Sequence, residues 1–143
     1  MKLQGTQCRD WEDIAVNKED GKSYIYLGDI GGNINPNLRN SLTIYKFEEP
    51  NVSHNMDGAD IHVSPNNIQT IKVNYPGNER YDCEAMAVDP SNGDILLFTK
   101  DHRHRQSRVY KVPHGSGYTK TLEYVSTLPH RQITGTDFHC KYK

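Results

Sequence analysis

Residues 10–16 read Asp-Trp-Glu-Asp-Ile-Ala-Val, and residues 82–88 read Asp-Cys-Glu-Ala-Met-Ala-Val. The two stretches align without a gap at an offset of 72 residues, which places Glu12 on Glu84. The same offset continues through residues 21–29, placing Gly21 on Gly93, Tyr24, Ile25 and Tyr26 on Leu96, Leu97 and Phe98, and Asp29 on Asp101. The chain therefore repeats itself, and an internal repeat is the first guide to its architecture.

Each copy contains four short segments that are predicted to be β-strands. The first segment is brief and apolar, as in a strand buried on both faces, and the third alternates polar and apolar residues. Asn92-Gly93 separates the first two segments of the second copy and favours a hairpin, since both residues tolerate positive φ. The segments are 13–16 and 85–88, 24–27 and 95–98, 42–47 and 108–112, and 69–73 and 121–125. Four antiparallel strands per repeat are typical of a β-propeller blade.

The repeats predict an all-β fold, a partial β-propeller of about two four-stranded blades with parts of flanking blades. The blades would span residues 10–81 and 82–132, and residues 133–143 read as the start of a further blade. Two blades cannot close a ring, which needs about four to eight. We therefore expect the chain to be a piece of a longer polypeptide that supplies the remaining blades, or else a protomer of a ring built from several chains.

Four stretches carry a family resemblance. Residues 10–15 read DWEDIA, residues 26–33 read YLGDIGGN, residues 44–50 read IYKFEEP and residues 82–86 read DCEAM. They resemble a largely uncharacterised family of β-propeller proteins whose members read D-x-E-D-(I/L)-A, Y-(I/V)-G-D-I-G-D-N and (I/V)-Y-R-F-x-E-P. The resemblance implies a six-bladed or similar ring, often exported, with no agreed activity, so it assigns no catalytic residue. Gly32 stands where the family usually has Asp, which would weaken a cation site built on that Asp.

Acidic residues lead into the first strand of each copy, where the innermost strands of a propeller would line its channel. Clustered carboxylates suit Ca²⁺, which takes about six to eight oxygen ligands. They could instead act as acid and base around a water, or bond backbone N–H groups of the neighbouring blade and set the angle between blades. Asp137 would join them from the next blade. The candidate metal ligands are Asp10, Glu12, Asp29, Asp82, Glu84 and Asp101.

The composition limits the other classes of function. The chain has 143 residues, a formal net charge of -1 and 34% hydrophobic residues, so no global field favours nucleic acid. No apolar run approaches the ~18–20 residues of a membrane span. Cys8, Cys83 and Cys140 form no CxxC pair, which disfavours structural zinc. In a secreted protein their odd number would leave one thiol free or paired with a cysteine outside this chain. The sequon that begins at Asn51 would be usable only on a secretory route.

These observations favour a secreted or extracellular-matrix binding or scaffold protein, with a protein or matrix partner and no assigned catalytic activity. The alternative is a cation-dependent hydrolase of the phytase or lactonase propeller type, with a carboxylate-lined channel. An intracellular WD-repeat hub is disfavoured, because the sequence contains no Gly-His and Trp-Asp pair of that repeat.

Overall fold

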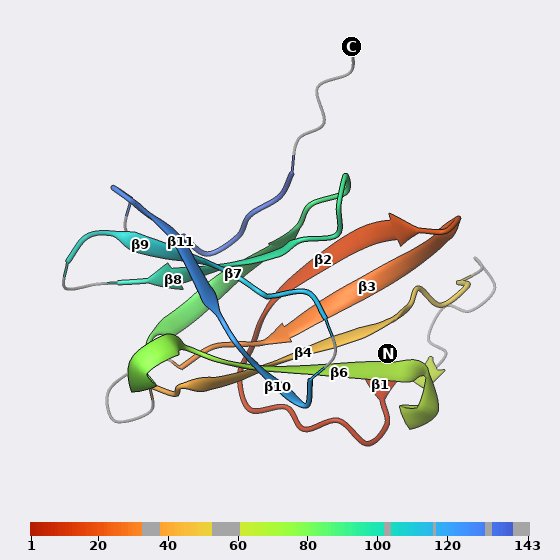
Figure 1. Cartoon of the computed structure of the whole chain (residues 1–143). Helices are drawn as coiled ribbons and strands as arrows, with labels where there is room; N and C mark the ends of the chain where they lie inside the picture. The colour runs from red at the N-terminus through yellow and green to blue at the C-terminus, as the bar shows by residue number, and fades with distance from the viewer. Residues whose placement is uncertain (33–37, 53–60, 102–103, 116, 131–132, 139–143) are drawn as a thin grey trace, which may run out of the picture.

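The computed structural model describes residues 1–32, 38–52, 61–101, 104–115, 117–130 and 133–138. In these ranges the chain forms strands and two short 3₁₀ helices, η2 (Pro65–Asn67) and η3 (Pro76–Asn78). Two main sheets lie against each other, with β2 of the first beside β7 of the second (Figure 1). No helix among the described residues has the length and apolar character to span a membrane. The all-β prediction is confirmed, and the described strands form no closed ring.

The first sheet is built on an antiparallel meander from the first sequence repeat. Its strand order is β10-β6-β4-β3-β2. A tight hairpin joins β2 to β3, because Asp20 and Gly21 take the positive φ values of 48° and 79° that a two-residue turn needs. The meander strands are β2 (Trp11–Glu19), β3 (Lys22–Asp29), β4 (Ser41–Glu48) and β6 (Ile68–Asn74). A two-stranded parallel sheet of β1 (Lys2–Leu3) and β5 (His62–Val63) accompanies it.

The second sheet has the strand order β11-β9-β8-β7 and is antiparallel throughout. Its strands are β7 (Asp82–Val88), β8 (Ile95–Lys100), β9 (Ser107–Lys111) and β11 (Glu123–Leu128). Every residue of β7 is buried, as expected for a strand covered on both faces. The same expectation is wrong for residues 13–16 of β2, where Ile14 and Val16 are exposed.

The predicted strand at residues 121–125 is divided in the structure. β10 (Thr119–Thr121) pairs in parallel with β6 of the first sheet, whereas β11 pairs with β9 of the second. Leu122 separates them, with its side chain buried between the sheets and its N–H bonded to Asn74 O at 2.8 Å. Burial of this leucine holds the crossing in place, so the first sheet gains a fifth strand.

The repeat offset also changes along the chain. Val16 faces Ile25 across β2 and β3, whereas Val88 faces Ile95 across β7 and β8. The second strands therefore correspond at an offset of 70 rather than 72, because eight residues separate Val16 from Ile25 whereas six separate Val88 from Ile95. On this pairing Asp29 corresponds to Thr99, and its predicted equivalence with Asp101 is wrong.

The main core lies between the two sheets. It contains apolar side chains from the inward faces of both, packed around β2 and β7. Its members are Tyr26, Ile30, Leu42, Ile44, Val73, Tyr75, Cys83, Met86, Val88, Ile95, Leu97, Tyr110, Val112 and Leu122. A smaller cluster of Ile25, Phe47 and Val63 covers part of the opposite face of the first sheet.

Candidate functional site

The acidic ends of β2 and β7 lie close together in the structure. Glu12 and Glu84 each occupy the extra position of a β-bulge, at corresponding places in the two repeats. Bulges of this kind redirect a side chain and are common beside functional sites. Burial, the charges of Glu84, Asp10 and Asp82, and a hydrogen bond with Asp10 raise the pKa of Glu12 to about 7. This end of the sheets therefore concentrates negative charge.

Asp29 belongs to a buried ion pair at the same end. Its Oδ1 lies 2.7 Å from Nη2 of Arg39, and both side chains are buried. The same carboxylate accepts hydrogen bonds from the backbone N–H groups of Asp10 at 2.9 Å and Arg9 at 3.3 Å. Asp29 thus fixes the chain that leads into β2.

Two aspartates bond backbone amides across the two sheets. Asp13 Oδ2 accepts a hydrogen bond from Met86 N–H at 2.7 Å, and Asp82 Oδ1 accepts one from Gly32 N–H at 3.0 Å. Such bonds to the backbone of a neighbouring blade are one of three uses that the sequence leaves open for the acidic residues, beside cation binding and acid-base chemistry. For Asp82, the structure shows that structural use.

Glycines allow the acidic side chains to approach the chain between β3 and β4. A Cβ atom at Gly31 would overlap the carboxyl groups of Glu12 and Asp10, so a larger residue there would displace them. A Cβ atom at Gly32 would lie 3.3 Å from the carbonyl oxygen of Tyr81, which is closer than most side chains tolerate. The tight backbone accounts for glycine at both positions.

The remaining sequence candidates have partners of their own or are exposed. Glu84 is buried 3.0 Å from Lys100 Nζ, and its pKa is raised by burial despite the opposing effect of Lys100. Asp101 follows Lys100, which faces Asp82 across β7 and β8, and its carboxylate lies 2.8 Å from His104 Nδ1. Asp137 is exposed. Among the described residues no group of three or more His, Cys, Asp or Glu side chains is arranged to hold a metal ion, and the calcium site stays a prediction.

The raised pKa of Glu12 has a consequence for stability. Between the ordinary value of 4.5 and about 7, the folded chain keeps a proton that the unfolded chain has released. The free energy of unfolding should therefore fall as pH rises through this interval. In Glu12→Gln we expect that slope to flatten, and above pH 7 we expect a melting temperature higher than wild type by roughly 2–5 °C.

Thermal unfolding with a chelator present, at pH values below 4.5 and above 7, measures this effect. Glu49→Gln, which changes an exposed glutamate, is the control and should keep the wild-type slope. If the stability of Glu12→Gln depended on pH as steeply as that of wild type, Glu12 would not be the source of the pH dependence.

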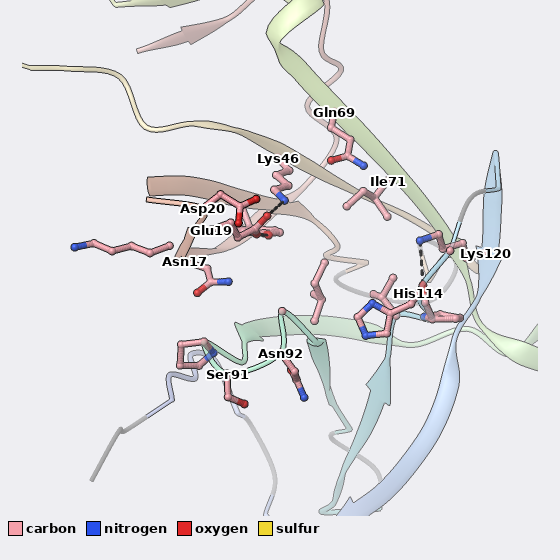
Figure 2. Close-up of a pocket in the computed structure, with 18 residues that line it drawn as sticks. Asn17, Glu19, Asp20, Lys46, Gln69, Ile71, Ser91, Asn92, His114 and Lys120 are labelled. Atoms are coloured by element: carbon pink, nitrogen blue, oxygen red, sulfur yellow. Dashed lines mark hydrogen bonds and ion pairs between the residues drawn. The ribbon is translucent and has the colours of Figure 1, made fainter. Parts of the chain in front are cut away.

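A polar cleft opens at the opposite end of β2 and β7. Its volume is about 510 Å³, and it lies between the hairpin after β2, the turn after β7 and the segment after β9. Figure 2 shows Asn17, Glu19 and Lys46 on one side, with Ser91 and Asn92 facing them from the turn after β7. His114 and Lys120 extend the lining at the end of the cleft.

Glu19 is held in place on the first sheet's side of the cleft. Its carboxylate accepts hydrogen bonds from Tyr26 Oη and Lys46 Nζ. Burial raises the pKa of Glu19, but the bonds from Lys46 and Tyr26 lower it overall below its ordinary value, so the group is ionised at neutral pH. Lys46 Nζ also lies 5.2 Å from the centre of the Tyr26 ring. The cleft thus has a rigid, charged wall.

Sequence reasoning did not find this cleft. Its lining combines Asn17 and Lys46 of the first repeat with Ser91 and His114 of the second. No local motif joins them, because they meet only when the two sheets pack. Lys46 interrupts the alternation of β4 at a position in phase with the apolar residues Leu42 and Ile44, and this is the local signal that could have drawn attention to the cleft.

Comparison of the whole chain with known protein families, with curated proteins and with solved structures finds no match. Function is therefore argued from the geometry of this molecule.

Proposed function

We propose that this chain forms part of a β-propeller-type binding or scaffold protein, secreted or located in an extracellular matrix. The single observation that carries the proposal is the pair of hydrogen bonds that link one repeat to the other, in which Met86 N–H donates to Asp13 and Gly32 N–H donates to Asp82. They use acidic side chains to fix one sheet against the next. Carboxylates that accept backbone hydrogen bonds from the neighbouring repeat hold the two sheets rigidly together, as a binding surface requires.

The polar cleft supplies a surface for binding. Amide, hydroxyl and ammonium groups line it, and the fixed carboxylate of Glu19 adds an acceptor whose orientation is already set. Preorganised polar groups lower the entropic cost of binding a polar ligand. We assign the partner contact to this cleft, with a matrix protein or polysaccharide as the class of partner.

The secretory location has its own support. Asn51 begins the sequon and is exposed. The thiol of Cys8 is also exposed, where an oxidising compartment would allow it to pair. Glycosylation of Asn51 in a secreting host, detected as a mass loss on deglycosylation, would support this location.

A cation-dependent hydrolase of the phytase or lactonase type is the second candidate. It is favoured by Glu12, whose pKa of about 7 lets it carry a proton near neutral pH beside Asp10, Asp82 and Glu84. A general acid and a bound calcium ion could both use this end of the sheets.

Calorimetric titration with Ca²⁺, paired with turnover assays on phosphate-ester and lactone panels, separates the two functions. The scaffold proposal expects no turnover above buffer in wild type. It also expects Asp13→Ala to lower stability by about 1–3 kcal/mol, because Met86 N–H loses its partner. Glu12→Gln combined with Glu84→Gln serves as the matched variant of the acidic end.

Two outcomes would overturn the scaffold proposal. One is calcium-dependent turnover that disappears in the double glutamine variant while the fold is retained. The other is a set of Asp13→Ala and Asp82→Ala variants as stable as wild type. Calcium binding without turnover, lost in the double variant, is compatible with a scaffold whose acidic end holds a structural ion.

A further inference from the structure

The polar cleft is too small to receive a folded protein. Its volume of about 510 Å³ lies within the range of about 300–1,000 Å³ that is typical of small-molecule sites. A stable contact between two folded proteins covers about 800 Å² of each surface. The occupant of the cleft is therefore a small molecule or one short segment of a polymer.

Charges on the lining of the cleft largely offset one another. The Glu19 carboxylate is paired with Lys46 Nζ, and Lys18 and Asp20 lie beside it in the chain, both exposed and opposite in charge. Lys120 Nζ donates to a backbone carbonyl at 3.0 Å. A cleft with so little net charge exerts no strong attraction on an anionic polymer, and a neutral ligand leaves its ion pair intact.

The turn after β7 holds two polar groups in fixed orientations on one wall of the cleft (Figure 2). Ser91 Oγ donates to Asp89 Oδ1 at 2.6 Å. Asn92 Oδ1 accepts from Asp94 N–H at 2.8 Å, and Asn92 Nδ2 donates to Asp94 Oδ2 at 3.2 Å. Ser91 and Asn92 are exposed, and a hydroxyl or a primary amide can make further hydrogen bonds beyond these. Both are therefore preorganised to bond a ligand.

The other wall offers an amide beside an aliphatic surface. Gln69 and Ile71 lie two residues apart on one face of β6, and Ile95 and Val112 of the core also line the cleft. A pyranose ring carries hydroxyl groups around its edge and C–H groups on its faces, so it matches both kinds of surface. An extended peptide is less suited, because β4 and β6 are each paired on both sides and offer no free strand edge.

We propose that the cleft binds a short segment of a neutral polysaccharide. Hydroxyl groups of the sugar bond Ser91 and Asn92 on one wall and Gln69 on the other, and the C–H face of a ring lies against Ile71 and Ile95. The inference rests on the proposed binding function and names the ligand of that same cleft.

NMR titration of the ¹⁵N-labelled whole chain with neutral tetrasaccharides tests the proposal. The probes are linear tetramers of glucose, of mannose and of N-acetylglucosamine, and a hyaluronan tetrasaccharide is the anionic probe. At least one neutral probe should give saturable shifts at the backbone amides of Ser91, Asn92 and Gln69. The affinity should stay the same at about 0.5 M salt, since salt screens charges and the ligand carries none.

Two substitutions locate the binding in the cleft. Asn92→Ala and Gln69→Ala should each weaken binding of the neutral probe by about three- to tenfold, because each removes a hydrogen bond to a hydroxyl group. Both residues are exposed, so neither change is expected to unfold the chain. Asn66→Ala is the matched control, since Asn66 is an exposed amide outside this cleft and should keep the wild-type affinity.

Three results would overturn the proposal. One is that no neutral probe shifts the amides of the cleft. Another is that the hyaluronan probe binds there instead, with an affinity that falls as salt rises. The third is that Asn92→Ala and Gln69→Ala both bind the neutral probe as tightly as wild type does.

The proposed function is tested separately, by turnover and by the stability of Asp13→Ala. A peptide from a matrix protein that binds the cleft in place of every sugar would overturn this inference and leave the proposed binding function standing. Calcium-dependent turnover lost in the double glutamine variant would overturn the scaffold proposal, whatever the cleft binds.

Discussion

Arg39→Ala is expected to destabilise the protein by about 3–5 kcal/mol, one of the largest effects of any single change considered for this chain. The substitution removes the guanidinium that lies 2.7 Å from Asp29 and leaves that carboxylate buried without its opposite charge. Burying an uncompensated charge costs far more than losing an exposed pair. Chemical denaturation at neutral pH measures the loss as a shift of the unfolding midpoint with little change in slope.

The chain offers an exposed ion pair as the control for this experiment. Lys22 and Glu48 lie 2.7 Å apart with both side chains exposed, so Lys22→Ala should cost no more than ~1 kcal/mol. Arg39→Lys keeps the charge and should recover part of the stability. If Arg39→Ala and Lys22→Ala cost the same, the buried pair is not the anchor that its geometry indicates.

Tyr110→Ala is expected to destabilise the protein by about 3–5 kcal/mol through a different cause. Tyr110 is buried at the centre of an aromatic group, with its ring 5.0 Å from the ring of Tyr75 and 5.9 Å from that of Tyr124. Its truncation would leave a cavity in the core between the sheets and remove edge-to-face contacts. The unfolding midpoint in denaturant measures the change.

Tyr110→Phe separates packing from hydrogen bonding at this position. The phenylalanine keeps the ring and loses the bond from Tyr110 Oη to Glu79 Oε2 at 3.0 Å, which should cost about 0.5–1.5 kcal/mol. Tyr118→Ala changes an exposed tyrosine and should fall within ~0.5 kcal/mol of wild type. A Tyr110→Phe variant as damaged as Tyr110→Ala would assign the stability to the hydrogen bond.

Much of the strand pattern could be predicted because it rests on local sequence. Alternation in residues 42–47 and the apolar stretch 85–88 both lie inside observed strands, and the Asn92-Gly93 turn joins β7 to β8. The predicted fourth strand at 121–125 pairs with the third strand from Glu123 onward, but Thr121 belongs to β10, which pairs with the first sheet. Nothing near Leu122 indicates that the strand before it joins the first sheet and the strand after it the second.

The acidic end was predicted in part. Glu12, Asp10, Asp82 and Glu84 do come together, because equivalent positions of the two repeats lie side by side on β2 and β7. Asp101 is not the equivalent of Asp29, since hairpins of different length shift the repeat by two residues after β2 and β7, and its part in a cation site stays a prediction. A repeat aligned by sequence alone carries no information about that shift.

The sequence by itself predicted the all-β class and the positions of most strands and tight turns, since these follow from residue type and spacing over a few positions. Only the tertiary structure decided that Arg39 neutralises Asp29, that a polar cleft opens beside Glu19, and that Ile14 is exposed while Met86 is buried. These features depend on which distant segments meet when the sheets pack. Packing, burial and charge pairing arise from the contact between two distant segments and cannot be read from either segment alone.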